Sequence, residues 1–105
     1  MTAAEPMMRE PLLPNAAVFG VSVAAELTGV NPQMLRAYEA KGLLEPFRTA
    51  GGTRRYSTND LERVRRICVL LEAGLNLAGI KHVIELQDET DLLRAELAAR
   101  PAQPR

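Results

Sequence analysis

The chain contains few cysteine, histidine and aromatic residues, and their scarcity excludes several classes of protein. Its 105 residues include one cysteine, Cys68, one histidine, His82, and no tryptophan. A single cysteine excludes an internal disulfide and fits a reducing cytoplasm. One Cys and one His on separate predicted helices make a poor metal site, and Cys68 is expected to pack in the core. We therefore expect no metal and no other cofactor.

Long apolar runs are also missing. No stretch approaches the roughly 20 apolar residues that span a bilayer. The first residues lack the basic start and apolar segment of a secretory signal. These features predict a cytoplasmic protein with no membrane partner.

Recognisable catalytic groupings are absent from the sequence as well. There is no glycine-rich loop to cradle phosphate, no nucleophile with a histidine partner, and no paired carboxylates in a pocket-like context. The sequence therefore predicts a protein that is not an enzyme.

Positive and negative residues are equal in number over the whole chain but are unevenly distributed along it. The formal net charge is zero, yet residues 21–82 hold nine cations and six anions, while residues 83–105 hold three cations and five anions. Between Arg36 and Arg66 there are eight Lys or Arg residues against four Asp or Glu. A local basic patch, rather than total charge, is what attracts a phosphate backbone. This pattern points to double-stranded DNA, with association with the nucleoid as a consequence.

The pattern of turn and cap residues predicts a mainly α fold. Ser22 is expected to cap a first short helix that ends at Gly29, and Asn31 to cap a second that ends at Gly42, with Pro32 at its first position. Two short helices with a glycine-containing turn are a helix-turn-helix signature.

A two-stranded wing is predicted directly after these helices. Its strands are expected at residues 44–48 and 53–56, and the turn between them contains two glycines. Pro46 restricts the first strand to an edge position. Together with the two helices before it, this hairpin predicts a winged helix-turn-helix.

Two further helices and a short last one are expected after the wing. A capping box at residues 57–60 opens a helix to about residue 73, and Asn76 caps the next, whose apolar side includes Leu86. Asp88 and Glu89 are expected to open a short C-terminal dimerisation helix. The predicted organisation is a disordered tail over residues 1–17, a DNA-binding domain over 18–87, the dimerisation helix over 88–100 and a disordered tail over 101–105.

These elements, in this order, resemble the MerR family of transcription regulators. The most specific pieces are the run from Leu35 to Glu39, the run from Lys41 to Leu44, and the run from Gly51 to Ser57 that leads into a helix. The segment from Gly74 to Lys81 is similar to the heat-shock-repressor subgroup. The resemblance implies a stress-response repressor that binds an inverted repeat as a homodimer, with a chaperone or another protein as effector.

The resemblance also implies roles for individual residues. The helix from residue 32 to 41 enters the major groove, where Gln33 and Asn31 are the candidate base readers. Arg and Tyr side chains of this helix and of the wing contact phosphates, and the N–H groups of the wing glycines approach the backbone. The candidate DNA-binding residues are Ser22, Asn31, Gln33, Arg36, Tyr38, Lys41, Arg48, Gly51, Gly52, Arg54, Arg55 and Tyr56.

Several residues also have plainer interpretations. Tyr38 and Tyr56 could be half-buried core tyrosines, a role that is compatible with binding. Arg63, Arg65 and Arg66 are expected to form a solvated helix face. The candidate dimerisation residues are Leu92, Leu93 and Leu97, although this stripe could also fold back on its own domain.

Two other functions remain open at this point. The chain could be an architectural winged-helix protein that coats DNA head to tail, in which case loss of the leucine stripe would leave binding intact. It could also be an interaction adaptor for a chaperone or sigma factor. In that case Arg55→Ala would leave DNA affinity unchanged.

Overall fold

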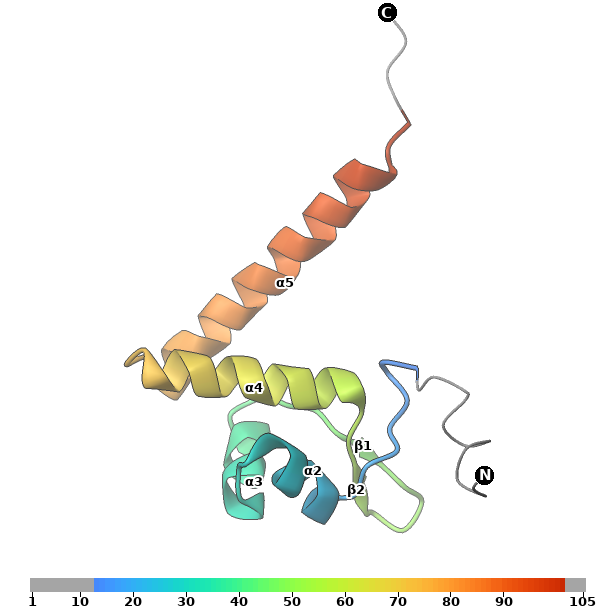
Figure 1. Cartoon of the computed structure of the whole chain (residues 1–105), viewed down its shortest axis with the longest axis vertical. Helices are drawn as coiled ribbons and strands as arrows, with labels where there is room; N and C mark the ends of the chain where they lie inside the picture. Colours follow the sequence, from blue (N-terminus) through green and yellow to red (C-terminus); the bar gives the residue numbers. More distant parts are fainter. Residues whose placement is uncertain (1–12, 102–105) are drawn as a thin grey trace, which may run out of the picture.

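Four α-helices and one two-stranded sheet make up this computed structural model, which describes residues 13–101 (Figure 1). The elements are α2 (Val21–Thr28), α3 (Pro32–Ala40), β1 (Phe47–Arg48), β2 (Arg54–Arg55), α4 (Thr58–Glu72) and α5 (Leu77–Ala99). Helix α4 lies across α2 and α3, and α5 projects away from this domain (Figure 1). The predicted mainly α fold with a helix-turn-helix and a two-stranded wing is confirmed.

Local sequence sets the boundaries of the first two helices. Gly29, at a φ of 76°, ends α2, and the Asn31 side chain accepts the Met34 N–H at 2.8 Å to begin α3. The predicted cap at Ser22 is wrong, because the N-cap of α2 is Gly20 and no side chain caps it. The reason is a β-bridge between Phe19 and Tyr56, which keeps the chain extended as far as Gly20.

The predicted capping box at the start of α4 is present. Ser57 Oγ accepts the Asp60 N–H at 3.0 Å, and the Asp60 carboxylate accepts the Ser57 N–H at 2.8 Å. These two bonds satisfy N–H groups that a helix start otherwise leaves unpaired. They fix the point at which the chain turns from the wing into α4.

The wing is shorter than predicted. Phe47 pairs with Arg55 and Arg48 with Arg54 in an antiparallel register, whereas residues 44–46 are outside the sheet. Leu44 is buried in the core, and Pro46 has no N–H to donate to a partner strand. Tyr56, predicted in the second strand, pairs with Phe19 instead.

The C-terminal part of the chain differs most from the prediction. Helix α5 is continuous over 23 residues, so the expected break before Asp88 is wrong and the boundary predicted at 87/88 falls inside α5. No Gly or Pro interrupts it there, and the Asp88 carboxylate pairs with two arginines of α4 rather than capping a new helix. Leu86, expected on the apolar side, is 62% exposed.

The core lies where α2, α3, α4 and the first turns of α5 meet. Its buried apolar residues are Ala24, Leu35, Tyr38, Leu43, Leu44, Tyr56, Leu61, Val64, Ile67, Ile80 and Ile84. Cys68 packs against this cluster, as expected. The core therefore holds both helices of the helix-turn-helix and the base of the wing in place.

The predicted tails fall largely beyond the region that the structure describes. Residues 1–12 and 102–105 lie outside the described residues. Within the predicted N-terminal tail, the Pro14 carbonyl accepts the Asn59 N–H at 2.9 Å at the start of α4. None of the helices described is long and apolar enough to cross a membrane.

Candidate nucleic-acid interface

Helix α3 presents a polar face to solvent while its other face is fixed in the core. Leu35 and Tyr38 are buried, whereas Gln33 and Arg36 are exposed. Asn31 Oδ1 is occupied by its bond to the Met34 N–H, so this atom caps the helix rather than facing outward as an acceptor. Gln33 is therefore better placed than Asn31 for reading a base edge.

The wing is joined to α3 by one carboxylate. Glu39 on α3 accepts a hydrogen bond from Arg54 Nε at 2.6 Å and another from Arg48 Nη2 at 2.8 Å. Burial alone would raise the pKa of Glu39, but the hydrogen bonds and charges of Arg54 and Arg48 outweigh it, so the pKa lies below its usual value. Glu39, which is not among the DNA-binding residues expected from the sequence, thus fixes the wing against α3.

The turn of the wing is exposed and closed by backbone bonds. The Thr49 N–H donates to the Thr53 carbonyl at 2.9 Å, and Gly52 adopts a φ of 87°, which favours glycine. Gly51 and Gly52 are both exposed, with open space where a Cβ would stand. The Gly52 N–H donates to the Thr49 carbonyl at 2.8 Å, so within residues 13–101 it is the Gly51 N–H that another molecule can approach closely.

Three cations of this region have no ion pair within residues 13–101: Arg36, Lys41 and Arg55. Arg36 and Lys41 are exposed at α3. Arg55 is half-buried, and its Nη1 lies 3.1 Å from where a Cβ on Gly20 would stand, at the start of α2. This guanidinium therefore sits beside the uncapped first turn of α2, where Ser22 is exposed.

The two tyrosines lie in the core rather than on this surface. Tyr38 is 2% exposed and Tyr56 is fully buried. Burial first, and then Cys68, raise the pKa of Tyr38; burial likewise raises that of Tyr56. Among residues 13–101 the Tyr56 hydroxyl has no hydrogen-bond partner. Neither side chain is placed to meet a phosphate in this conformation.

The arginines of α4 are less solvated than expected. Arg65 pairs with Glu62 on the same helix at 3.0 Å, but Arg63 and Arg66 both pair with Asp88 of α5. The solvated face expected from the sequence is wrong for Arg63 and Arg66, because a contact between two helices cannot be read from the spacing within one.

Helix α5 carries an exposed apolar stripe beyond the domain. Every residue from 85 to 101 is exposed. Leu86, Leu93 and Leu97 recur at intervals of seven and four residues, a spacing that places them on one face. Leu92 lies off this face, between Glu89 and Glu96 on the charged side of the helix. A groove of about 750 Å³ between α4 and α5, lined by Glu62, Arg66, Val83 and Leu86 among others, adjoins the stripe.

Metal-binding groupings of three or more His, Cys, Asp or Glu do not occur among the residues that the structure describes. His82 is exposed on α5 and Cys68 packs against the core. The exposed side chains of α3 and the wing offer guanidinium, ammonium, amide and backbone N–H donors, which suit phosphates and base edges.

Comparison with known proteins identifies relatives along most of the described chain. The family described as MerR HTH family regulatory protein matches residues 19–87. A Streptomyces coelicolor protein that carries the name heat shock protein HspR is 49% identical over 87 residues, which are 82% of this chain and 55% of that protein. The HTH-type transcriptional regulator GlnR of Bacillus anthracis is 36% identical over 74 residues, 70% of this chain and 57% of the relative. The chain thus spans little more than half the length of these relatives.

A solved structure agrees with this assignment. The fold is similar to that of HiNmlR, a MerR family regulator lacking the sensor domain, bound to promoter DNA, with a TM-score of 0.57 and 25% identity. The similarity covers 76% of this chain and 87% of that one. The family match over residues 19–87, the identity to HspR and this shared architecture show that the chain belongs to the MerR HTH family of regulatory proteins.

Proposed function

We propose that this chain is a sequence-specific DNA-binding transcriptional repressor that acts as a homodimer on an inverted repeat. The observation that carries the proposal is the pair of adjoining surfaces, α3 and the wing, that Glu39 joins. Together they present Gln33 and the cations Arg36, Lys41 and Arg55, which form no ion pair within residues 13–101. Cations on two fixed elements suit a duplex, whose phosphates lie at regular intervals on both sides of a groove.

In this proposal α3 enters the major groove. Gln33, in its first turn, can bond an adenine through N6 and N7, the bidentate pairing that amide side chains make. Arg36, one turn further along, reaches a phosphate and fixes the register. The amide specifies sequence, whereas the guanidinium positions the protein.

The wing arginines can contact phosphate without leaving Glu39. A guanidinium has five N–H donors, and Arg54 uses only Nε for the carboxylate. Its two terminal nitrogens remain available. The partly satisfied arginines therefore offer donors whose direction Glu39 has already set, which lowers the ordering cost of binding.

A third phosphate position lies at the start of α2. The uncapped N–H groups of its first turn, the exposed Ser22 hydroxyl and the neighbouring Arg55 guanidinium all favour an anion. Occupation by phosphate would also relieve the unfavourable placing of a cation at the positive end of a helix.

Dimer formation through α5 is supported by its exposure. More than a dozen residues of α5 extend beyond the core, and an isolated helix of that length is marginal in water. The stripe of Leu86, Leu93 and Leu97 needs another apolar surface, and a second copy supplies one of matching spacing.

The similarity to a protein named for heat shock supports a stress-response role, with a chaperone or other protein as effector.

Selection of bound sequences from random duplex DNA tests the proposal. We expect an enriched inverted repeat, and an affinity that falls by about 10³–10⁵ between about 50 and 200 mM salt for 6–10 phosphate contacts. Binding without an enriched motif would instead favour an architectural coat. Failure to bind duplex DNA at low salt would overturn the proposal in favour of a protein-interaction adaptor.

A further inference from the structure

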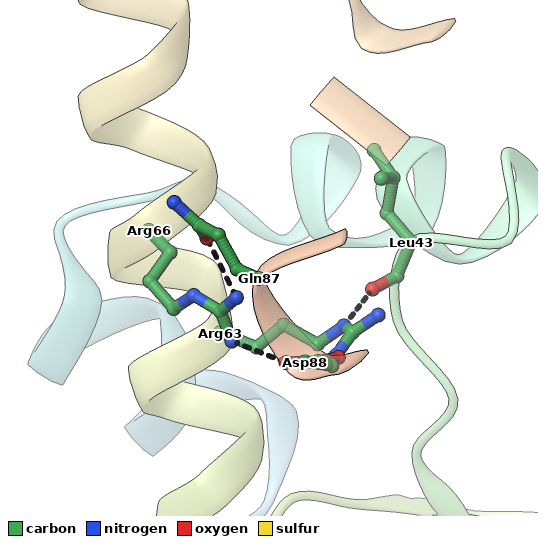
Figure 2. A network of polar contacts seen from close by, with 5 residues as sticks. All are labelled: Leu43, Arg63, Arg66, Gln87 and Asp88. Atoms are coloured by element: carbon green, nitrogen blue, oxygen red, sulfur yellow. Dashed lines mark hydrogen bonds and ion pairs between the residues drawn. The ribbon is translucent and has the colours of Figure 1, made fainter. Parts of the chain in front are cut away.

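Three segments of the chain meet in one polar network (Figure 2). Arg63 and Arg66 of α4 donate to the two carboxylate oxygens of Asp88 on α5, at 3.0 and 3.1 Å. Arg66 Nη2 also donates to Gln87 Oε1 at 2.7 Å, and Arg63 Nε donates to the Leu43 carbonyl at 2.6 Å. We call these five residues the α4–α5 latch.

The latch stands where α5 leaves the domain. Ile80 and Ile84 anchor the first turns of α5 in the core. Asp88 lies one turn beyond Ile84, and within residues 13–101 no α5 residue after it has a hydrogen bond or ion pair to another element. The buried pair Ile80 and Ile84 and the latch are therefore two successive points of attachment for α5. A helix attached at two points has a fixed direction, whereas a helix attached at one point can rotate about it.

We propose that Asp88 is a positioning residue, whose bonds to Arg63 and Arg66 hold α5 at a set angle to the DNA-binding domain and thereby determine the half-site spacing that the dimer accepts. This inference rests on the proposed function for its consequence on DNA, but the hold on α5 is a property of the protein alone.

The angle between α5 and the DNA-binding domain is important because α5 extends well beyond the latch. From Asp88 to Leu97 the helix rises about 13.5 Å at 1.5 Å per residue. If two copies meet along this segment, a small rotation about the latch moves both copies of α3 relative to each other. Half-sites on one face of B-DNA recur every 34–36 Å or so, and this spacing tolerates little error.

The latch also reaches the DNA-binding surface. Leu43 follows directly on Gly42, which ends α3, and leads into the segment before β1. Arg63 thus holds the exit of α3 with its Nε and the departing α5 with its Nη1. A change in the direction of α5 is consequently transmitted to α3, the helix that carries Gln33 and Arg36.

A distance measurement tests the hold without DNA. Spin labels are placed at Ala50→Cys in the wing turn and Ala95→Cys on α5, in a Cys68→Ala background diluted into excess unlabelled protein. We expect one narrow distance distribution, which Asp88→Ala and the isosteric Asp88→Asn both broaden. Glu89→Gln, which removes a neighbouring charge outside the latch, should leave the distribution narrow. An unchanged distribution in both Asp88 variants would overturn the proposal.

The consequence for DNA is read from duplexes that carry two half-sites separated by a spacer varied one base pair at a time. We expect the parent protein and Glu89→Gln to prefer one spacer. Asp88→Asn should lose about two- to thirtyfold of that preference, the range typical of coupling carried by such contacts, with unchanged affinity for a single half-site. Retained spacer preference in Asp88→Asn contradicts the inference. If the parent protein binds no DNA, the proposed function fails, while the distance measurement still decides whether Asp88 holds α5.

Discussion

Glu39 Oε1 on α3 lies 2.6 Å from Nε of Arg54 on β2, although the two residues are fifteen positions apart. The second oxygen of the same carboxylate accepts a bond from Arg48 on β1. One side chain therefore connects α3 with both strands of the wing, and sets their relative orientation before any DNA is bound.

Replacing Glu39 with Gln should lower stability in a pH-dependent way. Burial raises the pKa of Glu39, but the hydrogen bonds and charges of Arg54 and Arg48 lower it by more, so the pKa lies below its usual value. A lowered folded pKa contributes stability that is present above the unfolded pKa and lost as pH falls through the folded pKa. We expect Glu39→Gln to cost about 1 kcal/mol near neutral pH, at the upper end for partly exposed pairs.

Urea denaturation at fixed protein concentration measures this effect. The difference between Glu39→Gln and the parent should shrink as the pH falls through the lowered pKa of Glu39, because the parent carboxylate then becomes protonated as well. Glu26→Gln, on the exposed side of α2, serves as the control and should show no such difference. A Glu39→Gln deficit that is constant with pH would contradict the explanation.

Arg36→Ala and Arg55→Ala should each weaken DNA binding about equally on all sequences. Each removes a cation that has no ion pair within residues 13–101, so the slope of log affinity against log salt should fall by about 1 per lost phosphate contact. Arg65→Ala, which removes a guanidinium paired within α4, is the matched control. Unchanged affinity in Arg55→Ala would favour the adaptor function instead.

What the sequence predicted correctly was mainly local. Asn31, Gly29 and the Ser57 capping box act on backbone groups within a few residues, so their effect is visible in a short stretch of sequence. The helix-turn-helix and the wing follow from such signals. The links between distant segments, such as Glu39 with Arg54, depend on the packed arrangement and could not be read from spacing.

The error at α5 has a similar cause. Asp88 and Glu89 are typical of a helix start, and on that basis a break was predicted. In the folded chain Asp88 instead meets Arg63 and Arg66, more than twenty residues earlier. An aspartate side chain can either lie at the start of a helix or pair with arginines of another helix, and its tertiary neighbours decide which of these it does.

Leu93→Ser with Leu97→Ser should abolish dimerisation, whereas Leu92→Ser should not. The first two lie on the exposed face shared with Leu86, while Leu92 lies among charged residues on another side of α5. Sedimentation or light scattering at micromolar protein measures the mass, and footprinting measures occupancy of both half-sites. Loss of the dimer in Leu92→Ser alone would show that the contact uses a different face, since all three leucines were candidates from the sequence.

Tyr56→Phe separates a core role from a DNA contact. The hydroxyl of Tyr56 is buried and has no hydrogen-bond partner in the part of the chain that the structure describes, and leaving such a group unsatisfied costs about 1–3 kcal/mol. Phenylalanine keeps the ring and removes that cost, so we expect stability equal to or greater than that of the parent and unchanged DNA affinity. Thermal denaturation and a binding titration check the two expectations. A loss of affinity with intact stability would mean that the hydroxyl reaches a phosphate after repacking on DNA, the role that the family resemblance implies for it.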